Sequence, residues 1–422
     1  MSVLSGNHEL AIAAGNVDLT PTQRVPLASY RALRTEKFES IADSLEANVA
    51  VFHAAGVPTV FVSADLLYIG SYISERIFAA FADRVPRERI FLTASHTHFA
   101  PATEDSLPGL GRADPEYREW AVERIIALTA SLLAQPSVAI DAGYHEASFA
   151  YSVNRRRRKW GIGRNFPHFG FQTIIAPNES GLRDDVIRVL VPRDAHGKVN
   201  AICWSYACHP NTYPRINAVS AEYPGYVRQA LRQRFGNIPV LFWQGFSGNI
   251  NPYRYPHAAH LAQASRERFI APDLSHWEQW CKILASAVEA AVDAADRRIG
   301  GPISCQLRSI DLKELGLRSD KRLVCRTIRF GDALAVCGLS AEVVVEYVAR
   351  VRAAHLPVPV VPVGCMDDVF GYLPDGGMMS GGGYEVTGFL RRFGLGGKFK
   401  RSVGDIVAHR LLRSAASGAS NA

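Results

Sequence analysis

The sequence predicts an α/β fold of the mixed α+β kind, in which helices cover a mixed β-sheet. Short apolar runs rich in β-branched and aromatic residues, the pattern of strands, occur along the whole chain. Amphipathic segments with helical periodicity lie between several of them, without the regular spacing of βαβ units. The 422 residues are 48% hydrophobic, which is enough to bury a large core.

The strand pattern is found in eight segments. They are residues 59–63, 89–95, 186–191, 199–207, 240–244, 323–330, 333–339 and 358–363. The helical pattern is found in six segments. They are residues 45–55, 72–82, 115–134, 225–235, 277–295 and 341–354. Pro115 fits the first turn of its helix, where the missing backbone N–H would have no partner in any case.

Residues 151–183 differ from both patterns. They contain a basic run at 155–159, several aromatic residues and no clear periodicity. We therefore expect a long loop, which inside a compact domain is usually functional. This loop is expected to cover a substrate cleft. Its candidate wall residues are Trp160, Phe166, Phe169 and Phe171.

The formal net charge is +7, and basic residues are concentrated at 155–159 and 391–401. Such runs either bind anionic groups or form a solvated surface, and the pattern leaves both open. The seven cysteines are scattered without a C-x-x-C pair, which excludes a disulfide framework and a cysteine-rich zinc module. The chain has no recognisable signal peptide and no apolar run near the ~20 residues of a membrane span. We therefore expect a cytoplasmic protein.

Histidines follow the ends of two predicted strands. His96 and His98 form an H-x-H pair after the strand at 89–95, and side chains two apart on an extended segment share a face. His209 follows the strand at 199–207. Neutral imidazole is the commonest metal ligand in proteins, although such histidines also occur as ordinary hydrogen-bonded residues. The spacing makes all three candidate ligands and leaves the structural role open.

Other candidate residues are ambiguous when each is taken alone. The backbone amides of Gly245 and Gly248 are candidates for an oxyanion site or for a simple glycine-rich turn. Ser247 lies in G-F-S-G, which is not the G-x-S-x-G of a nucleophile elbow. Glu342 is expected in the first turn of a helix, where the macrodipole favours a carboxylate without any function. Tyr372 alone indicates no function.

Taken in order, these segments resemble the neutral, non-lysosomal ceramidase family. Seven short motifs occur in the family's order along nearly the whole chain. They are Ala-Gly-Asn-Val-Asp-Leu-Thr-Pro at 14–21, Ser-His-Thr-His at 95–98, Val-Asn-Arg at 153–155, Ala-Cys-His-Pro at 207–210, Gln-Gly-Phe-Ser-Gly-Asn-Ile-Asn-Pro at 244–252, Gly-Leu-Ser-Ala-Glu at 338–342 and Phe-Gly-Tyr-Leu-Pro at 370–374, followed by Gly-Tyr-Glu at 383–385. Each motif is weak alone, whereas seven in order are hard to obtain by chance.

The resemblance implies one zinc ion (Zn2+) held by four residues. They are His96, His209, Glu342 and Tyr372. It also implies that His98 and Arg155 bind or polarise the scissile carbonyl. Protonation of the leaving group needs an acid, and the sequence leaves open whether His98 or Tyr372 supplies it. Because ligands so far apart in the sequence must converge, we expect one catalytic domain over residues 1–415. Residues 416–422 are expected to form a disordered tail.

Departures from the family pattern affect the expected chemistry. Asn251 occupies the position of the serine proposed as nucleophile in ceramidases, so zinc-bound water is the expected nucleophile. The family's Asn-Arg-Ser-Pro continuation is absent after Arg155, so a substrate other than ceramide is expected. The family's C-terminal immunoglobulin-like domain is also expected to be absent.

The sequence thus predicts a zinc-dependent amidohydrolase that cleaves the linear amide (N-acyl) bond of a small molecule, which can carry an anionic group. Two alternatives stay open. One is an esterase or lactamase with the same zinc centre, and the other is a non-catalytic protein that binds anions or nucleic acid through residues 155–159. The chemically competent ligand set favours the enzyme. Because RNA-recognition and helix-turn-helix motifs are absent, we expect no nucleic-acid partner. The oligomeric state is left open.

Overall fold

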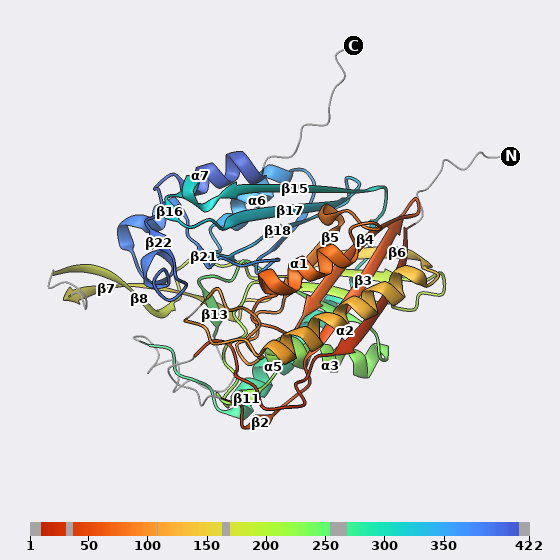
Figure 1. Cartoon of the computed structure of the whole chain (residues 1–422), viewed down its shortest axis with the longest axis horizontal. Coiled ribbons are helices and arrows are strands. Elements are labelled where there is room, and N and C mark those ends of the chain that lie inside the picture. Colours follow the sequence, from red (N-terminus) through yellow and green to blue (C-terminus); the bar gives the residue numbers. More distant parts are fainter. Residues whose placement is uncertain (1–9, 31–36, 108, 163–168, 254–267, 413–422) are drawn as a thin grey trace, which may run out of the picture.

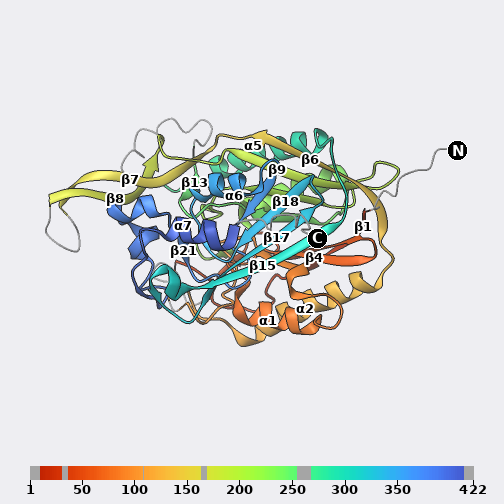
Figure 2. The same ribbon diagram turned by 90° about the horizontal axis from the view of Figure 1, so that it is seen from above.

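The computed structural model describes residues 10–30, 37–107, 109–162, 169–253 and 268–412, without the side chains of Ile162 and Phe169. Within these residues the chain forms four layers (Figures 1 and 2). Helices cover one face of a large sheet, a second sheet packs on the other face, and further helices cover the second sheet. This arrangement confirms the predicted α/β class with a mixed sheet. The tail expected at 416–422 lies outside the described residues.

The large sheet has nine strands in the order β12-β10-β9-β6-β1-β3-β4-β5, with β14 paired to β6. The strands are β1 (Leu10–Asp18), β3 (Glu46–Ala54), β4 (Val57–Ala64), β5 (Ile90–Ala94), β6 (Val138–Ser148), β9 (Val186–Arg193), β10 (Ile202–Tyr206), β12 (Val240–Gln244) and β14 (Arg297–Ile299). The pairs β4–β5 and β10–β12 are parallel. The pairs β1–β3 and β6–β9 are antiparallel.

One strand of this sheet contradicts a helix prediction. Residues 45–55 are predicted to be helical but include β3, which pairs with β1 along one edge and with β4 along the other. Seven of its nine side chains are buried, because both faces of the strand are covered. Burial on both faces removes the apolar–polar alternation by which a strand is recognised in a sequence.

The second sheet has four strands in the order β15-β17-β18-β20. They are β15 (Ile303–Asp311), β17 (Arg322–Phe330), β18 (Leu334–Leu339) and β20 (Val360–Val363). Phe330 of β17 reaches the large sheet, where its ring centroid lies 5.5 Å from that of Phe52 and 6.3 Å from that of Phe61. Such aromatic contacts bury a large apolar area between the two sheets.

Helices form the outer layers. They are α1 (Gly70–Ala80), α2 (Pro115–Ala134), α3 (Glu222–Phe235) and α5 (Leu274–Asp293) on the large sheet, and α6 (Tyr347–His355) and α7 (Val403–Val407) on the second sheet. Shorter helical turns are η2 (Arg87–Arg89), η3 (Leu312–Leu315), η4 (Gly376–Gly381), η5 (Tyr384–Gly388) and η6 (Ala408–Leu412). The α2 helix has the predicted bounds, and Asp114 caps it by accepting a hydrogen bond from Tyr117 N at 3.0 Å. Every helix in the described ranges is too short or too polar to cross a lipid bilayer.

Four small sheets complete the fold. They pair β2 (Ser40–Ile41) with β11 (Ala218–Val219), β7 (Ser152–Ile162) with β8 (Phe169–Asn178) and β13 (Ile250–Pro252), β16 (Leu317–Arg318) with β22 (Gly396–Gly397), and β19 (Glu342–Val343) with β21 (Tyr372–Leu373). The prediction of a loop at 151–183 is therefore wrong, since most of this segment forms the β7–β8 hairpin. This hairpin projects from the rest of the molecule (Figures 1 and 2).

The edge strand β12 of the large sheet lies close to two strands from the other half of that sheet, β3 and β4. Ser63 Oγ of β4 donates to the backbone oxygen of Phe242 in β12 at 2.7 Å, and Val240 N donates to Asn48 Oδ1 of β3 at 3.0 Å. The segment after β20 contacts the end of β12, because Gly364 N donates to the carbonyl oxygen of Gln244 at 2.8 Å. Segments that follow several strands thus meet at one end of the molecule.

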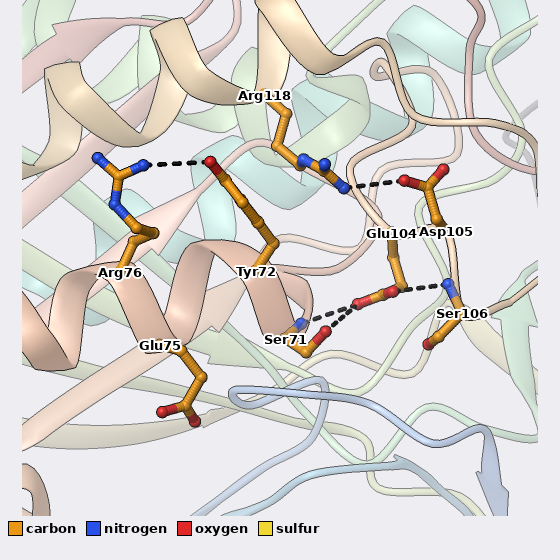
Figure 3. Close-up of a pocket in the computed structure, with 8 residues that line it drawn as sticks. All are labelled: Ser71, Tyr72, Glu75, Arg76, Glu104, Asp105, Ser106 and Arg118. Atoms are coloured by element: carbon orange, nitrogen blue, oxygen red, sulfur yellow. Dashed lines mark hydrogen bonds and ion pairs between the residues drawn. The ribbon is translucent and has the colours of Figure 1, made fainter.

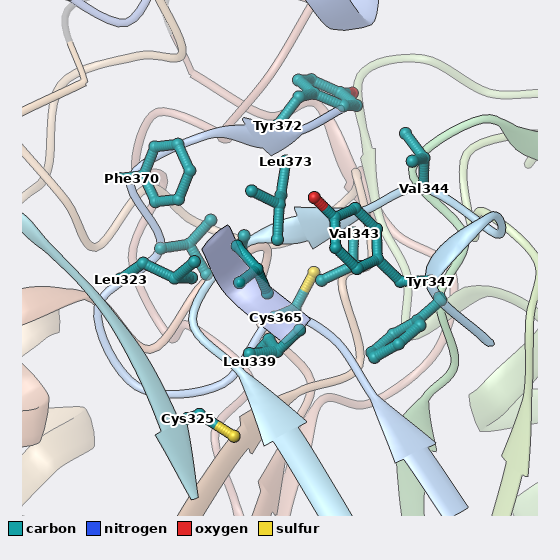
Figure 4. Packing of buried hydrophobic residues seen from close by; sticks show 14 of the residues in the cluster. Leu323, Cys325, Leu339, Val343, Val344, Tyr347, Cys365, Phe370, Tyr372 and Leu373 are labelled. Atoms are coloured by element: carbon teal, nitrogen blue, oxygen red, sulfur yellow. The ribbon is translucent and has the colours of Figure 1, made fainter. Parts of the chain in front are cut away.

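An apolar core supports the short β19–β21 pair. Val343 and Leu373 of this pair pack with Leu339, Tyr347 and Phe370, and all five side chains are fully buried (Figure 4). Interiors packed at such density hold neighbouring side chains in fixed positions. The residues that begin β19 and β21 are therefore held rigidly.

Candidate metal centre

Segments that follow different strands bring the four predicted ligands together. His96 follows β5, His209 follows β10, and Glu342 and Tyr372 begin β19 and β21. Glu342 lies directly opposite Tyr372 in the parallel β19–β21 pair. All four side chains are almost completely buried. His96 has a positive φ of 65°, which is uncommon for a residue other than glycine and is typical of functional sites.

The helix expected at 341–354 begins later than predicted. Glu342 lies on a strand, where its N–H donates to the carbonyl oxygen of Gly371 at 2.8 Å, and α6 begins only at Tyr347. Ser340 has the sequence position of a helix N-cap. Its hydroxyl oxygen instead accepts a hydrogen bond from Val324 N at 2.8 Å. The carboxylate of Glu342 therefore contacts the centre and does not stabilise a helix N-terminus.

Backbone carbonyl groups fix the tautomers of two histidines. His96 Nδ1 lies 3.0 Å from the oxygen of Leu67, and His209 Nδ1 lies 2.7 Å from the oxygen of Ser247. Because a carbonyl oxygen only accepts hydrogen bonds, both Nδ1 atoms carry the proton and both Nε2 atoms present a lone pair. The two Nε2 atoms lie 3.2 Å apart.

Glu342 adds a third acceptor to this pair. Its Oε2 atom lies 3.3 Å from His96 Nε2 and 3.2 Å from His209 Nε2. Within the described residues no hydrogen-bond donor reaches Oε2, whereas the hydroxyl of Tyr68 donates to Oε1. Three potential acceptor atoms thus face one another in a buried space, an arrangement that is stable only with a metal cation or a shared proton among them. Imidazole nitrogen and carboxylate oxygen are a donor set that suits zinc.

His98 lies beside these ligands. The ligating atoms of His96, His98 and His209 all lie within 4.8 Å of one another, a spacing that can hold a metal ion. His98 is half-buried, and its Nδ1 atom lies 2.8 Å from Ser29 Oγ. The H-x-H pattern pointed to this group. Ser29 and Tyr68 were missed, because a lone serine or tyrosine outside any motif carries no signal in the sequence.

Burial and neighbouring charges set the protonation of the centre. Burial, together with the positive charge of Arg155, lowers the pKa of His209 to about 4. Burial alone raises the pKa of Glu342, but the neighbouring imidazoles of His96 and His209 hold it well below its ordinary value. Burial lowers the pKa of His96, but without a metal ion the neighbouring Cys365 and Glu342 raise it well above its ordinary value. A neutral imidazole and an ionised carboxylate are the forms that bind metal ions.

Arg155 is buried next to Tyr372 and is held by three side chains. Its Nε atom donates to Glu385 Oε1 at 2.8 Å, and its terminal nitrogens donate to Asn251 Oδ1 at 3.3 Å and to the hydroxyl of Tyr372 at 3.1 Å. The guanidinium has five N–H donors, so donors remain for a further acceptor. A fixed positive charge therefore lies against one of the predicted ligands.

Arg156 differs from its expected role. It is predicted to be exposed or to bind an anionic substrate group, but its side chain is largely buried and donates to Glu385 Oε2 at 2.6 Å. It also donates to the carbonyl oxygen of Gly382 at 2.7 Å. The prediction failed because Glu385 lies 229 positions away in the sequence.

Four aromatic residues are expected to wall the cleft, and the structure describes the side chains of two of them. Neither of these two lines a cleft. Trp160 and Phe171 are 59% and 58% exposed on the projecting hairpin. Phe166 and the side chain of Phe169 lie outside the described residues. An aromatic residue in a sequence indicates apolar packing, but on a hairpin that leaves the body of the molecule it faces solvent.

The glycine-rich turn after β12 serves packing instead of an oxyanion site. The amides of Gly245 and Gly248 donate to main-chain carbonyl oxygens at 3.1 and 2.8 Å. A Cβ atom on Gly245 would lie 2.8 Å from the backbone of Ala207, and one on Gly248 would lie 2.7 Å from the oxygen of Glu342. The two glycines therefore let this turn approach the segments that carry two of the predicted ligands.

A surface groove near α1 and the start of α2 is separate from this centre (Figure 3). It is lined by Ser71, Tyr72, Glu75, Arg76, Glu104, Asp105, Ser106 and Arg118. Arg118 donates to Asp105 at 2.9 Å, and Glu104 accepts from the backbone N–H groups of Ser71 and Ser106 at 2.8 and 2.7 Å. The polar groups of the groove thus bind one another.

Comparisons with known proteins identify the architecture. No family model matches the chain, and no curated protein matches it by sequence. The solved structure of neutral ceramidase from Pseudomonas aeruginosa is similar, with a TM-score of 0.74 and 15% sequence identity over 99% of this chain and 77% of that one. A ceramidase complexed with C2 is similar with a TM-score of 0.73 and 15% identity, over 98% and 78% of the two chains. The chain therefore has the fold of the neutral ceramidases, as its ordered motifs predict.

Proposed function

We propose that this protein is a zinc-dependent hydrolase that cleaves the linear amide bond of an N-acyl substrate. The observation that carries the proposal is the convergence of His96 Nε2, His209 Nε2 and Glu342 Oε2 at 3.2–3.3 Å from one another. A buried cluster of acceptors without a donor is destabilising unless a cation occupies it. The fold adds support, because both of the similar solved structures are named as ceramidases, which are amide hydrolases.

The ligands of the proposed zinc ion are His96, His209, Glu342 and Tyr372. A zinc ion bound there acts as a Lewis acid and lowers the pKa of a coordinated water molecule to roughly 7. The protein's own part is to hold the ligands. Leu67 and Ser247 orient the two imidazoles through their carbonyl groups, and Tyr68 orients the carboxylate.

Arg155 is assigned to the carbonyl oxygen of the substrate. Glu385 and Asn251 fix its guanidinium beside the hydroxyl of Tyr372, so that its charge is in place before the substrate binds. A preorganised donor of this kind stabilises the negative charge that develops on the carbonyl oxygen in the transition state. Arginine suits the role because it stays charged at any working pH.

His98 is assigned to proton transfer. Its Nδ1 atom lies 2.8 Å from Ser29 Oγ, and the proposal assigns the proton transfer to the other ring nitrogen, Nε2. The ring is half-buried, whereas His96 and His209 are fully buried. Positioned acid–base catalysis of this kind contributes about 10²–10⁴-fold to a rate.

Neither Asn251 nor Ser247 acts as the nucleophile in this proposal. Asn251 stands where ceramidases have a serine, and its side chain accepts from Arg155. Ser247 is buried and hydrogen-bonds to Gln244, while its carbonyl oxygen orients His209. With Asn251 at this position, and without the family's continuation after Arg155, the substrate is an N-acyl compound other than ceramide.

The anion-binding alternative loses part of its support. Glu385 accepts from both Arg155 and Arg156, so the first two arginines of the basic run are held inside the protein and their two positive charges are compensated in part. The ester alternative shares the same centre, and a substrate panel separates it from the amidase.

The decisive test measures bound metal on protein purified without chelators. We expect about one zinc ion per chain by elemental analysis, and its loss in His96→Ala and His209→Ala. His98→Ala should keep the metal and lose about 10²–10⁴-fold in turnover. A panel of N-acyl amines, their ester analogues and ceramide then identifies the bond cleaved.

His196→Ala is the matched control, because His196 is exposed in a surface turn. It should leave both metal content and turnover unchanged. The proposal is wrong if the wild-type protein carries no stoichiometric metal, or if both ligand variants retain it while remaining folded.

A further inference from the structure

The β7–β8 hairpin exposes large apolar side chains. Trp160 is 59% exposed, Phe171 58% and Ile175 48%. Clustered apolar side chains on a surface mark contact sites for a partner or a membrane. These three lie on a segment that extends away from the four layers (Figures 1 and 2).

The cross-strand register places the aromatic residues on one face. Trp160 lies opposite Phe171, and their rings meet edge to face at a centroid distance of 4.9 Å and an angle of 77°. Arg158 lies two residues from Trp160 on the same strand, with its guanidinium carbon 4.5 Å from the centroid of Phe171. A small apolar cluster with a cation on top of it therefore stands on the hairpin.

The hairpin is also strongly basic. Neither β7 nor β8 contains an aspartate or glutamate, while residues 155–159 are all basic. Glu385 forms ion pairs with Arg155 and Arg156 at the base of the hairpin. Arg157, Arg158 and Lys159 lie farther out along the strand. Arg158 shares the face of the aromatic pair, whereas Arg157 and Lys159 lie on the other face of the hairpin.

We propose that this hairpin docks the protein onto an anionic lipid bilayer. Trp160 and Phe171 enter the boundary between headgroups and acyl chains, where amphipathic aromatic rings are most stable. Arg157, Arg158 and Lys159 bind the phosphate and carboxylate groups of the lipids. The net charge of +7 on the whole chain favours the same surface.

The geometry of the aromatic pair favours a bilayer over single-stranded nucleic acid. Stacking of bases needs an open aromatic face. The face of Phe171 is covered by Arg158, and Trp160 meets Phe171 at 77° instead of forming a parallel platform. Exposed Ile175 adds aliphatic surface, which suits acyl chains and not bases.

Docking by this hairpin would place the metal centre near the membrane. Arg155 and Trp160 are on the same strand, five residues and roughly 17 Å apart in an extended chain. This step, unlike the docking itself, rests on the proposed function, and it indicates that the N-acyl substrate is lipid-soluble. The docking test measures binding without turnover, so its result is independent of the proposed hydrolase activity.

The test is sedimentation of the full chain with vesicles of phosphatidylcholine and phosphatidylserine at a 3:1 ratio. We expect binding that falls steeply between 50 and 500 mM salt, and about tenfold or greater loss of binding to the vesicles in Trp160→Ser/Phe171→Ser. Arg157→Ser/Arg158→Ser should lose roughly 25-fold, since each charge near the surface contributes about fivefold. Brominated lipids should quench part of the tryptophan fluorescence of the wild-type protein. They should not quench the fluorescence of the tryptophans that remain in Trp160→Ser.

Val138→Ser and Arg298→Ser are the matched controls, because both positions are exposed outside the hairpin and should leave binding unchanged. The proposal is overturned if the wild-type protein does not bind these vesicles, or if the hairpin variants bind as well as the controls. Binding of single-stranded oligonucleotides without vesicle binding, or self-association abolished by Trp160→Ser, would assign the surface to a different partner and would equally overturn it.

Discussion

The same contact, a tyrosine hydroxyl on a glutamate, occurs in two opposite settings in this molecule. In the metal centre, Tyr68 donates to Glu342, whose other oxygen faces two imidazole nitrogens. Beside the surface groove, Tyr72 donates to Glu119, whose carboxylate accepts from Arg76 at 2.7 Å. The exposed carboxylate already has a cation, whereas the buried one faces further acceptors.

The exposure of each glutamate to solvent decides whether its carboxylate can lack a hydrogen-bond or ion-pair partner. The side chain of Glu119 is 43% exposed and that of Glu342 is 3% exposed. Water and salt compensate an imperfect arrangement on a surface, but a buried group without a partner is costly. The groove is therefore complete without a ligand, whereas the proposed metal centre brings together acceptor atoms that a metal ion could bridge. Variants at matched residues in the two places test this difference.

The largest expected effect comes from exchanging an arginine in each place. Arg155→Ala should lower kcat/KM by about 10²–10³-fold, the size of a lost oxyanion donor. Arg118→Ala, which removes an arginine of the groove, should leave kcat/KM unchanged. Steady-state kinetics on the preferred N-acyl substrate measures both.

A folding defect is excluded as the cause if Arg155→Ala keeps its metal and its near-ultraviolet spectrum, and Arg155→Lys recovers part of the rate. Equal and small losses in the Arg155 and Arg118 variants would mean that Arg155 is only an internal ion-pair partner of Glu385.

A smaller effect is expected from the two tyrosines. Tyr68→Phe removes the hydrogen bond that orients Glu342, and such outer partners typically contribute 10–100-fold to metal affinity. Tyr72→Phe makes the same chemical change beside the groove and should leave metal affinity unchanged. Competition with a chelating dye measures both affinities. Identical affinities in the two variants would mean that Tyr68 does not position a metal ligand.

The parts of the centre that the sequence predicted are those carried by short motifs at strand ends. His96, His98 and His209 stand out because imidazole after an apolar run is an unusual pattern, and the order of the motifs supplied Glu342, Tyr372 and the fold. Their roles in the centre stay a prediction, as do the single domain over residues 1–415 and the cytoplasmic location. Long-range pairing could not be predicted, since neither local periodicity nor spacing encodes it.

The missed features share this physical cause. Glu385 binds Arg155 from 230 positions away, and Ser29 reaches His98 across 69 positions. The interior strand at 45–55 has no alternation because both of its faces are buried. The sequence predicts a loop in place of the β7–β8 hairpin, because its basic and aromatic residues do not alternate with a row of apolar residues facing a core.

The smallest effect is expected at Glu104, the most buried carboxylate in the lining of the groove. It accepts from the backbone N–H and hydroxyl groups of Ser71 at the start of α1, and from Ser106 N. Burial alone raises the pKa of Glu104, but these hydrogen bonds and the charge of Lys321 outweigh it and lower the pKa below 4.5. A carboxyl group whose pKa is lowered on folding stabilises the protein above its unfolded pKa, and this contribution is lost as the pH falls through the folded pKa.

Glu104→Gln should therefore lower the free energy of unfolding by about 1 kcal/mol at pH 7, because a neutral amide accepts these hydrogen bonds less strongly. As the pH falls below 4.5, wild type and variant should converge, since the wild-type carboxyl group is then losing its charge. Denaturant unfolding of both proteins at matched pH values gives the difference, in which the titration of all other groups cancels. Metal content should be the same in both proteins, because Glu104 belongs to the groove. A penalty that is equal at pH 7 and at low pH would mean that the carboxylate's charge plays no part in holding α1.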